Sequence, residues 1–174
     1  MPSSIFHSPS SFAIVALGSN LGDSRRVIQQ VTARLQTFSN RPILKSSLWQ
    51  TSPVDCPPGS PMFINAIVGL LPRKEETPES LFGKLQSLQK EFGRQPKKTR
   101  NEPRPLDLDL IVFGAETRNT PELVLPHPRA HLRRFVLQPL NEIAPDLILP
   151  GQQNKVSGLL AELPGAENVE RLGG

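Results

Sequence analysis

The sequence predicts an α+β fold. Four short apolar runs, each of a length that suits one buried strand, alternate with two amphipathic segments that have the spacing of surface helices. Their order along the chain is strand, helix, strand, strand, helix, strand. This order predicts an antiparallel sheet with both helices on one face, and a proline-rich C-terminal part remains to cover the other face.

The first strand and the first helix are indicated by residues 12–38. Residues 12–17 form an apolar run that ends in a turn at Gly18. Asp23 is a residue type that caps helices, and apolar side chains follow it at helical spacing. These apolar side chains are Val27, Ile28, Val31, Leu35 and Phe38.

Two further strands are expected on either side of a proline-rich loop. Residues 43–51 are interpreted as a second, less regular strand, and residues 62–71 as a third strand in which Asn65 is the one polar side chain. Residues 52–61 between them contain four prolines. Because proline has no N–H to donate, this segment is expected to be a loop outside the sheet.

The second helix has a clear start signal at Thr77 and Pro78, where a capping side chain precedes a proline at the first helical position. Gly93 is expected to end this helix. Between these ends lies an apolar stripe formed by Leu81, Phe82, Leu85, Leu88 and Phe92.

A basic loop over residues 94–105 leads into a fourth strand over residues 106–113. The complete β-α-β-β-α-β order is the pattern of ferredoxin-like folds. Short helical segments are expected near residues 133–140 and 157–162, in an additional C-terminal segment of helices and loops.

The composition fits a single domain over residues 12–174, preceded by a disordered tail over residues 1–11. The tail is rich in Ser and Pro and lacks the basic and apolar regions of a signal peptide. No apolar run reaches the ~20 residues that span a bilayer. Cys56 is the only cysteine and is interpreted as an incidental thiol. We therefore expect a cytoplasmic protein without a membrane partner.

The positive charge is concentrated in the basic loop. The chain has a formal net charge of +4 at pH 7. Residues 94–105 contain five Lys or Arg side chains against Glu102 alone, an excess equal to that of the whole chain. Such a loop attracts polyanions, either nucleic acid or the phosphates of a nucleotide. From charge alone, a solvated loop without a ligand is an equally good interpretation.

Asp107 and Asp109 are the sharpest chemical feature. Since side chains alternate across a strand, both carboxylates should lie on one face and the neighbouring leucines on the other. Two carboxylates about 7 Å apart repel each other unless a positive group lies between them. Mg²⁺ prefers one or two carboxylates together with phosphate oxygens. A plainly solvated polar face is the alternative, but Arg104 and the cationic loop favour a metal–polyphosphate site.

His127 lies between two prolines and is followed by Arg129, Arg133 and Arg134. A single histidine is usually structural or exposed, but the adjacent arginines make this one a candidate phosphate contact. Residues 18–22 are flanked by glycines but lack the Gly-Lys-Ser/Thr ending of a P-loop.

Four stretches of the chain, in order, resemble the 6-hydroxymethyl-7,8-dihydropterin pyrophosphokinase family. They are Ala16-Leu17-Gly18-Ser19-Asn20-Leu21-Gly22; Phe63-Ile64-Asn65-Ala66; Gly93-Arg94 leading to Pro103-Arg104-Pro105-Leu106-Asp107-Leu108-Asp109; and Pro126-His127-Pro128 continuing through Arg133, Phe135-Val136-Leu137-Gln138-Pro139-Leu140 and Glu142-Ile143-Ala144-Pro145. They cover most of residues 13–150. The resemblance implies transfer of pyrophosphate from ATP to 6-hydroxymethyl-7,8-dihydropterin in folate synthesis, giving AMP and the pterin diphosphate.

The resemblance also implies a set of site residues. The catalytic and metal-binding groups are Arg94, Arg104, Asp107 and Asp109, with two Mg²⁺ ions expected on the two aspartates. The ATP contacts are Gln86, Gln89, Arg94, Arg104, Leu110, His127 and Arg133. The pterin contacts are Thr51, Val54, Phe63, Asn65 and Phe135. Two aromatic faces suit a flat heterocycle and an amide suits its polar edge, although core packing alone would also explain both phenylalanines.

The chain departs from the family pattern on the nucleotide side. Gln89 replaces a Glu, Pro96 an Arg, Asn101 and Glu102 a Trp-Gly pair, and Glu122 and Val124 an Arg and a Thr. We expect these differences to affect ATP affinity and loop closure more than the type of reaction.

The implied mechanism is attack of the pterin hydroxymethyl oxygen on the β-phosphorus of ATP, with AMP leaving. Positioning and charge neutralisation would carry it, and no general base is evident. We expect residues 52–61 and 94–105 to act as lids. We also expect that the protein has no nucleic-acid partner and that it associates with other folate-pathway enzymes.

Two alternatives remain at this point. One is a ferredoxin-like nucleic-acid-binding module that uses residues 94–105, although the sheet lacks an aromatic-rich stacking pattern and the chain has no tyrosine. The other is a different Asp-x-Asp metal enzyme such as a glycosyltransferase, for which 174 residues leave little room.

Overall fold

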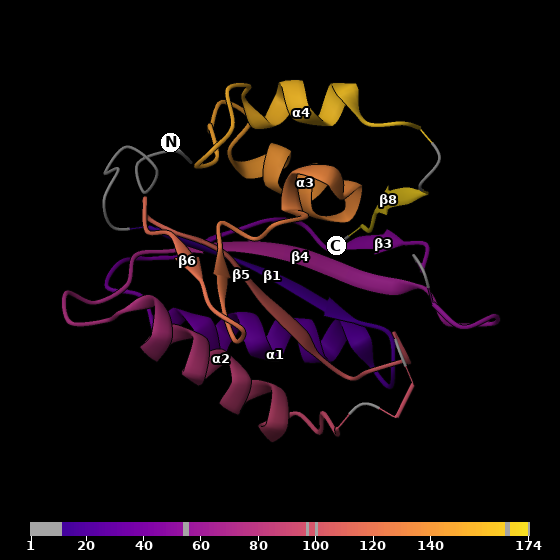
Figure 1. Ribbon diagram of the computed structural model, residues 1–174. Coiled ribbons are helices and arrows are strands. Elements are labelled where there is room, and N and C mark those ends of the chain that lie inside the picture. The colour runs from indigo at the N-terminus through magenta and orange to yellow at the C-terminus, as the bar shows by residue number, and fades with distance from the viewer. Residues whose placement is uncertain (1–11, 54–55, 97, 100, 166–167, 174) are drawn as a thin grey trace.

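The computed structural model describes residues 12–53, 56–96, 98–99, 101–165 and 168–173. The elements are β1 Ala13–Ser19, α1 Ser24–Gln36, β2 Leu44–Lys45, β3 Trp49–Thr51, β4 Phe63–Leu70, α2 Pro78–Glu91, β5 Asp107–Phe113, β6 Arg118–Asn119, β7 Val124–Leu125, a 3-10 turn Ala130–Leu132, α3 Arg134–Ile143, α4 Val156–Glu162 and β8 Val169–Arg171. An antiparallel sheet lies between α1 and α2 on one face and α3 and α4 on the other (Figure 1), which confirms the α+β class. The tail expected over residues 1–11 lies outside the described residues.

The main sheet has the order β5-β1-β4-β3-β8, with β2 also beside β4, and each of these pairings is antiparallel. β1 therefore lies between β4 and β5. In the register of the sheet, Gly18 of β1 is opposite Asn65 on one side and Asp107 on the other. Three residues from distant parts of the sequence are thus neighbours across the sheet.

The helices α1 and α2 begin where the sequence predicts. The Asp23 side chain accepts a hydrogen bond from the Arg26 N–H, and Thr77 forms a reciprocal capping box with Ser80. The apolar stripes of both helices pack on the same face of the sheet, where burying each large aliphatic side chain contributes roughly 1.5–3 kcal/mol. This core includes Val15, Leu17, Ile28, Val31, Leu35, Leu81, Leu85, Leu88, Leu108 and Leu110.

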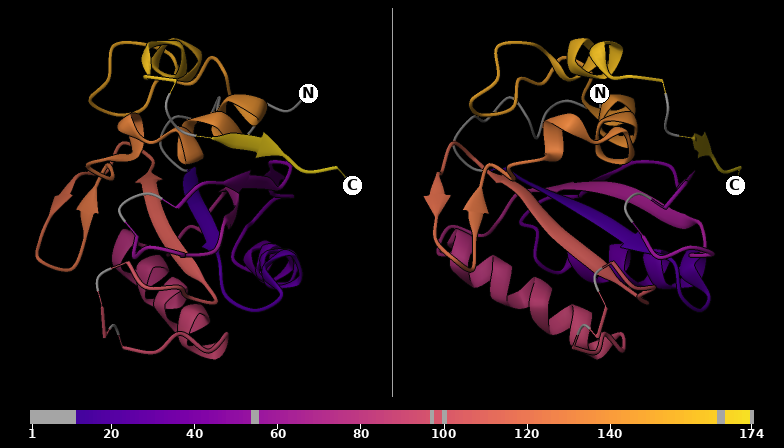
Figure 2. Two further views of the ribbon diagram at one scale, coloured as in Figure 1. Left: turned by 90° about the vertical axis from the view of Figure 1, so that its right-hand side faces the viewer. Right: turned by 45° about the vertical axis from the view of Figure 1, so that its right-hand side comes forward.

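The opposite face is covered by α3, and α4 packs on the outer side of α3; together they form the C-terminal segment expected from the sequence (Figures 1 and 2). Ile14, Ile67 and Ile111 of the sheet belong there to one apolar cluster with buried side chains of the two helices. These are Val136, Leu137, Leu140, Ile143, Val156 and Leu159. No helix in the described part of the chain has both the length and the apolar character that a membrane crossing requires.

The expected strand over residues 43–51 is divided in two. Between β2 and β3, the Ser46 hydroxyl accepts a hydrogen bond from the Ile67 N–H at 2.9 Å, while the Ser46 N–H donates to the Ile67 carbonyl. A side chain thus replaces one backbone acceptor and interrupts the regular ladder. The periodicity of the sequence indicates neither the β6–β7 hairpin nor β8, because two- and three-residue strands are too short to show a periodic pattern.

Candidate active site

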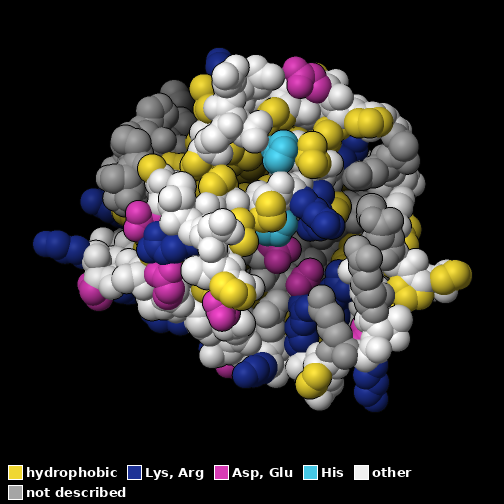
Figure 3. Space-filling view, in the orientation of Figure 1, with side chains coloured by type: hydrophobic (Ala, Val, Ile, Leu, Met, Phe, Trp, Pro, Cys, Tyr) yellow, Lys and Arg dark blue, Asp and Glu magenta, His cyan; other side chains and the backbone are white. Residues whose placement is uncertain are grey.

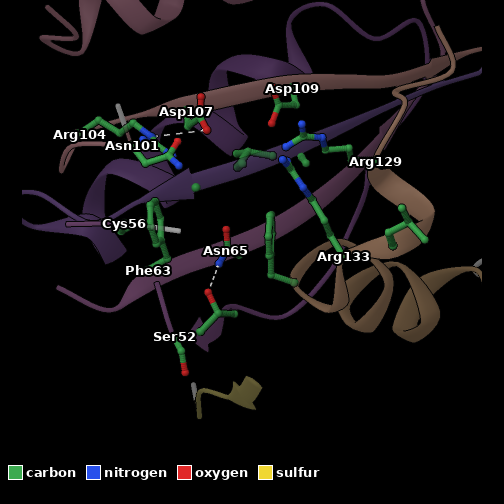
Figure 4. Close-up of a pocket in the computed structure, with 16 residues that line it drawn as sticks. Ser52, Cys56, Phe63, Asn65, Asn101, Arg104, Asp107, Asp109, Arg129 and Arg133 are labelled. Atoms are coloured by element: carbon green, nitrogen blue, oxygen red, sulfur yellow. Dashed lines mark hydrogen bonds and ion pairs between the residues drawn. The ribbon is translucent and has the colours of Figure 1, made fainter. Parts of the chain in front are cut away.

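A pocket of about 330 Å³ lies on the α3 face of the sheet, beside the start of α3. Acidic, basic and histidine side chains gather near the middle of the face shown in Figure 3. The floor of the pocket comes from neighbouring strands, and its walls come from two loops and the segment leading into α3 (Figure 4). Its lining is Ala16, Leu17, Gly18, Thr51, Ser52, Cys56, Phe63, Asn65, Asn101, Arg104, Asp107, Asp109, Arg129, Leu132, Arg133 and Phe135.

Asp107 and Asp109 lie on the same face of β5, as the alternation of the strand predicts (Figure 4). The Asp107 carboxylate is paired with two arginines of the basic loop. Its Oδ1 lies 2.5 Å from Arg94 Nη1, and its Oδ2 lies 3.5 Å from Arg104 Nε. The arginines therefore hold the loop against the beginning of β5 and balance one of the two acidic charges.

Asp109 has a different environment. Within the described residues, no hydrogen bond or ion pair joins its carboxylate to another side chain. Burial, followed by the neighbouring Asp107 charge, raises the pKa of Asp109 to about 6, against the opposing influence of Arg133, Arg94 and Arg104. An inward-facing carboxylate without a partner is the kind of group that a divalent cation would neutralise.

Gln89 of α2 connects the helix to the acidic strand. Its Oε1 accepts hydrogen bonds from the Leu108 N–H at 2.8 Å and from Arg94 Nη1 at 3.1 Å. Arg94 Nη1 also donates to the Leu106 carbonyl at 3.1 Å. The amide therefore orients Arg94 toward Asp107, although it lacks the negative charge of the Glu expected at this position.

The other end of the pocket is aromatic and amide-lined. The Arg104 guanidinium lies 5.2 Å above the Phe63 ring, and that of Arg133 lies 5.4 Å above the Phe135 ring. Asn65 is buried, and its Nδ2 donates to Thr51 Oγ1 at 2.5 Å. This bond, drawn as the dashed line from Asn65 in Figure 4, fixes which edge of the amide is left for a ligand.

Asn20 connects the two loops that border the pocket, and its role was not predicted. Its backbone N–H donates to the Arg104 carbonyl at 3.1 Å, and its Oδ1 accepts from the Arg104 N–H at 2.9 Å. Its Nδ2 donates to the Pro61 carbonyl at 3.3 Å. In the sequence Asn20 lies just after the first strand, and no local pattern links it to partners that are 41 and 84 positions away.

His127 is held by its backbone and by its ring. Its N–H donates to the Ile111 carbonyl at 2.8 Å, and its Nδ1 accepts from the Arg129 N–H at 3.2 Å. Burial, followed by the positive charge of Arg133, lowers the pKa of His127 to about 4. The imidazole is therefore neutral near pH 7 and could offer a phosphate a hydrogen bond but no positive charge.

The low pKa of His127 predicts a pH-dependent stability. The unfolded chain binds the proton at the ordinary histidine pKa of about 6.5, whereas the folded chain does so only near pH 4. The contribution of His127 to the free energy of unfolding is therefore fully present above pH 6.5 and is lost as the pH decreases toward 4. The variant His127→Asn, which keeps an acceptor but cannot titrate, should lose less stability over this range. Thermal unfolding of both proteins across the range measures the difference, and parallel curves would contradict it.

Several expected site residues lie away from the pocket lining. The Leu110 side chain is buried in the core beneath α1 and α2, so only its backbone could reach a nucleotide. Gln86 is exposed on α2, and Val54 lies outside the described residues. Glu122 and Val124, which are departures from the family pattern and not expected contacts, belong to the β6–β7 hairpin region. The contacts of Gln86, Val54 and the Leu110 backbone with a substrate stay predictions.

Two independent comparisons agree on a family. The family model described as "7,8-dihydro-6-hydroxymethylpterin-pyrophosphokinase (HPPK)" matches residues 14–145. A protein of Pseudomonas aeruginosa named 2-amino-4-hydroxy-6-hydroxymethyldihydropteridine pyrophosphokinase is 38% identical over 164 residues, covering 92% of this chain and 96% of the relative. A protein of the same name from Bacillus subtilis is 36% identical over 134 residues, covering 76% and 78%.

Solved structures share the fold. A crystal structure of HPPK-DHPS in complex with substrates superposes with a TM-score of 0.65 at 12% identity, covering 88% of this chain and 43% of that one. The wild-type HPPK-DHPS of Plasmodium falciparum gives a TM-score of 0.64 at 12% identity, covering 87% and 44%. The chain thus corresponds to less than half of these longer proteins.

Proposed function

This chain belongs to the 7,8-dihydro-6-hydroxymethylpterin-pyrophosphokinase family, and we propose that the pocket between β5 and α3 is where it transfers pyrophosphate from ATP to 6-hydroxymethyl-7,8-dihydropterin. The products are AMP and the pterin diphosphate used in folate synthesis. The observation that carries the proposal is that one pocket joins a pair of carboxylates, several arginines and an aromatic end with a buried amide.

The pterin is assigned to the aromatic end of the pocket. Phe63 and Phe135 offer flat faces to the heterocycle, and the Asn65 amide offers its polar edge a donor or acceptor. Thr51 fixes the orientation of that amide. Val54 remains a proposed further contact with the pterin, because it lies two positions after Ser52, which lines the pocket.

The phosphates of ATP are assigned to the cationic end. Arg94, Arg104 and Arg133 lie around the two aspartates and would balance the charge of the phosphate oxygens. His127 would add a neutral hydrogen bond, and Gln89 would keep Arg94 in place. Gln86 and the backbone of Leu110 remain proposed contacts with the nucleotide.

Asp107 and Asp109 are proposed to hold two Mg²⁺ ions. The unpartnered carboxylate of Asp109 fits such a role, and the two acids together supply hard oxygen ligands. Among the described residues, no group of three or more His, Cys, Asp or Glu is arranged to hold a metal by itself. Phosphate and water oxygens would therefore complete the coordination. When bound, Mg²⁺ would withdraw charge from the phosphates and increase the acidity of the attacking hydroxyl.

In the proposed reaction, the hydroxymethyl oxygen of the pterin forms a bond to the β-phosphorus of ATP, and the bond from that phosphorus to the α–β bridging oxygen breaks. AMP leaves with the bridging oxygen, and the hydroxyl proton is released. The chain holds the heterocycle between two rings, aligns the phosphates with arginines, and uses the loops over residues 52–61 and 94–105 to limit the access of water.

We further propose that residues 12–174 act as a single catalytic domain built on a ferredoxin-like arrangement of β1, α1, β3, β4, α2 and β5. The strand order β5-β1-β4-β3 supports this interpretation. Association with other folate-pathway enzymes is supported by a relative in Arabidopsis thaliana named "Folate synthesis bifunctional protein", 32% identical over 130 residues. A cytoplasmic location stays a prediction.

The test of the function is AMP release from ATP by the purified chain, with and without 6-hydroxymethyl-7,8-dihydropterin and Mg²⁺. We expect AMP only when both are present. AMP formation that does not depend on the pterin, or binding of RNA without AMP formation, would contradict the proposal.

Phe135 provides a test of the pterin assignment. The variant Phe135→Ala should weaken pterin binding by about tenfold, because a stacking face is lost. ATP binding should change much less, because Arg133 loses only its ring contact and keeps its charge. Isothermal titration with each ligand measures both effects. Equal losses for the two ligands would mean that Phe135 acts only as part of the core.

A further inference from the structure

The last strand of the sheet lies outside the part of the chain that the family model matches. That match ends at residue 145, whereas β8 covers Val169–Arg171. β8 nevertheless adds to the edge of the main sheet beside β3, whose last residue, Thr51, lines the pocket (Figure 2). Without β8, β3 would be an edge strand at the place where the site begins.

The hydrogen bonds between β3 and β8 continue into the pocket lining. The Leu172 N–H donates to the Leu48 carbonyl at 2.9 Å, and the Ser52 N–H donates to the Asn168 carbonyl at 3.0 Å. Ser52, which also lines the pocket, is therefore tied directly to the C-terminal segment. The hydrogen bonds between β3 and β8 thus end at Ser52, the first residue of the loop over residues 52–61.

The register shows which backbone N–H group of β8 points toward β3. Gln50 lies opposite Glu170, between the bonded pairs Leu48–Leu172 and Ser52–Asn168. In an antiparallel ladder, hydrogen-bonded and non-bonded pairs alternate, so the Glu170 N–H points toward β3. Val169, opposite Thr51, belongs to a non-bonded pair, and its N–H points away from β3.

A second connection runs from β8 to α3. Arg171 Nη1 lies 3.8 Å from Glu142 Oε2. Glu142 of α3 accepts hydrogen bonds from the Ser47 N–H at 2.8 Å and from Trp49 Nε1 at 3.1 Å. Burial alone would raise the pKa of Glu142. The hydrogen bond from the Ser47 hydroxyl, the two bonds from the Ser47 N–H and Trp49, and the charge of Arg171 outweigh it and lower that pKa, so the carboxylate stays charged. β8 thus contacts both β3 and the helix that carries Phe135.

We propose that β8 is a positioning element of the pterin end of the site, an inference that rests on the proposed function. By pairing with β3, it fixes the backbone at Thr51 and Ser52. The Thr51 hydroxyl in turn accepts a hydrogen bond from Asn65 Nδ2 at 2.5 Å. This bond determines which edge of the amide faces the pterin. The phosphate end is built on β5, the opposite edge strand of the sheet, and does not depend on this connection.

Two proline variants separate this role from general stabilisation. Glu170→Pro removes the N–H that points toward β3, whereas Val169→Pro, the matched control, removes one that points away. We expect Glu170→Pro to raise the KM for the pterin about fivefold, as the loss of one net hydrogen bond would, with the KM for ATP nearly unchanged. Val169→Pro should leave both constants near those of the unsubstituted chain. Equal changes in the two variants, or an unchanged KM for the pterin in Glu170→Pro, would overturn the proposal.

Hydrogen exchange of the unsubstituted chain gives a second measurement if Glu170→Pro fails to fold. Binding of 6-hydroxymethylpterin should slow exchange of the Glu170 and Leu172 amides, and ATP alone should not. Exchange that is unaffected by a pterin that does bind would overturn the role of β8. An inability to bind the pterin or to release AMP would instead contradict the proposed function.

Discussion

Replacing either acidic residue, as in Asp107→Ala or Asp109→Ala, should abolish AMP release while the protein remains folded. Both side chains face the pocket, and neither belongs to the apolar clusters that hold the helices on the sheet. Loss of one proposed metal ligand should reduce the rate by roughly a thousandfold or more, because several kcal/mol of charge stabilisation disappear. AMP release with Mg²⁺ in excess, together with circular dichroism, measures the rate and the fold.

The neutral amide variants make this prediction sharper. Asp109 has no ion-pair partner within the described residues and lies near a second acid, so Asp109→Asn should raise the melting temperature of the metal-free protein. Asp107→Asn removes the charge that pairs with Arg94 and Arg104 and should not raise it. Both variants should lose activity. An active Asp109→Asn protein would contradict the proposed metal site, and stabilisation of both variants would contradict the difference between the two carboxylates.

The acidic face could be predicted because it depends on local geometry. A strand places alternate side chains on opposite faces, and the contrast between leucine and aspartate shows which face is which. The caps of α1 and α2 are equally local, since each involves residues only three positions apart. For the same reason, the alternation of strands and helices up to residue 113 could be predicted from the sequence, except that the strand expected over residues 43–51 is divided into β2 and β3.

The contacts that complete the site are not local, and the sequence alone does not reveal them. Arg94 reaches Asp107 only because α2 ends beside the start of β5. Gln89 accepts a hydrogen bond from Arg94 and is itself held by the Leu108 N–H, which lies 19 positions away. Asn20 joins two loops that no periodic pattern connects. The family resemblance named most of the residues but gave none of these hydrogen bonds.

Substituting Gly18, as in Gly18→Ala, should reduce pterin affinity by roughly tenfold to a hundredfold. A Cβ added at Gly18 would lie 2.9 Å from Asn65 Oδ1, which is too close without movement. Asn65 has little freedom to move, because its Nδ2 is held by Thr51 at 2.5 Å. Displacing a buried amide from its ligand costs about one to three kcal/mol, which gives the expected loss. Gly83→Ala is the control, because an added Cβ there meets nothing within 4 Å.

The position of the added methyl group also predicts which kinetic constant changes. The Cβ would be 2.9 Å from Asn65 Oδ1 but 4.0 Å from the Cβ of Asp107, an ordinary van der Waals contact. The pterin end should therefore be displaced and the metal end left nearly intact. Steady-state kinetics should show a raised KM for the pterin, with kcat and the KM for ATP much less affected. A fall in kcat at an unchanged KM would mean that Gly18 makes room for the reacting phosphate rather than for the heterocycle, and the assignment of the two ends of the pocket would have to be reversed.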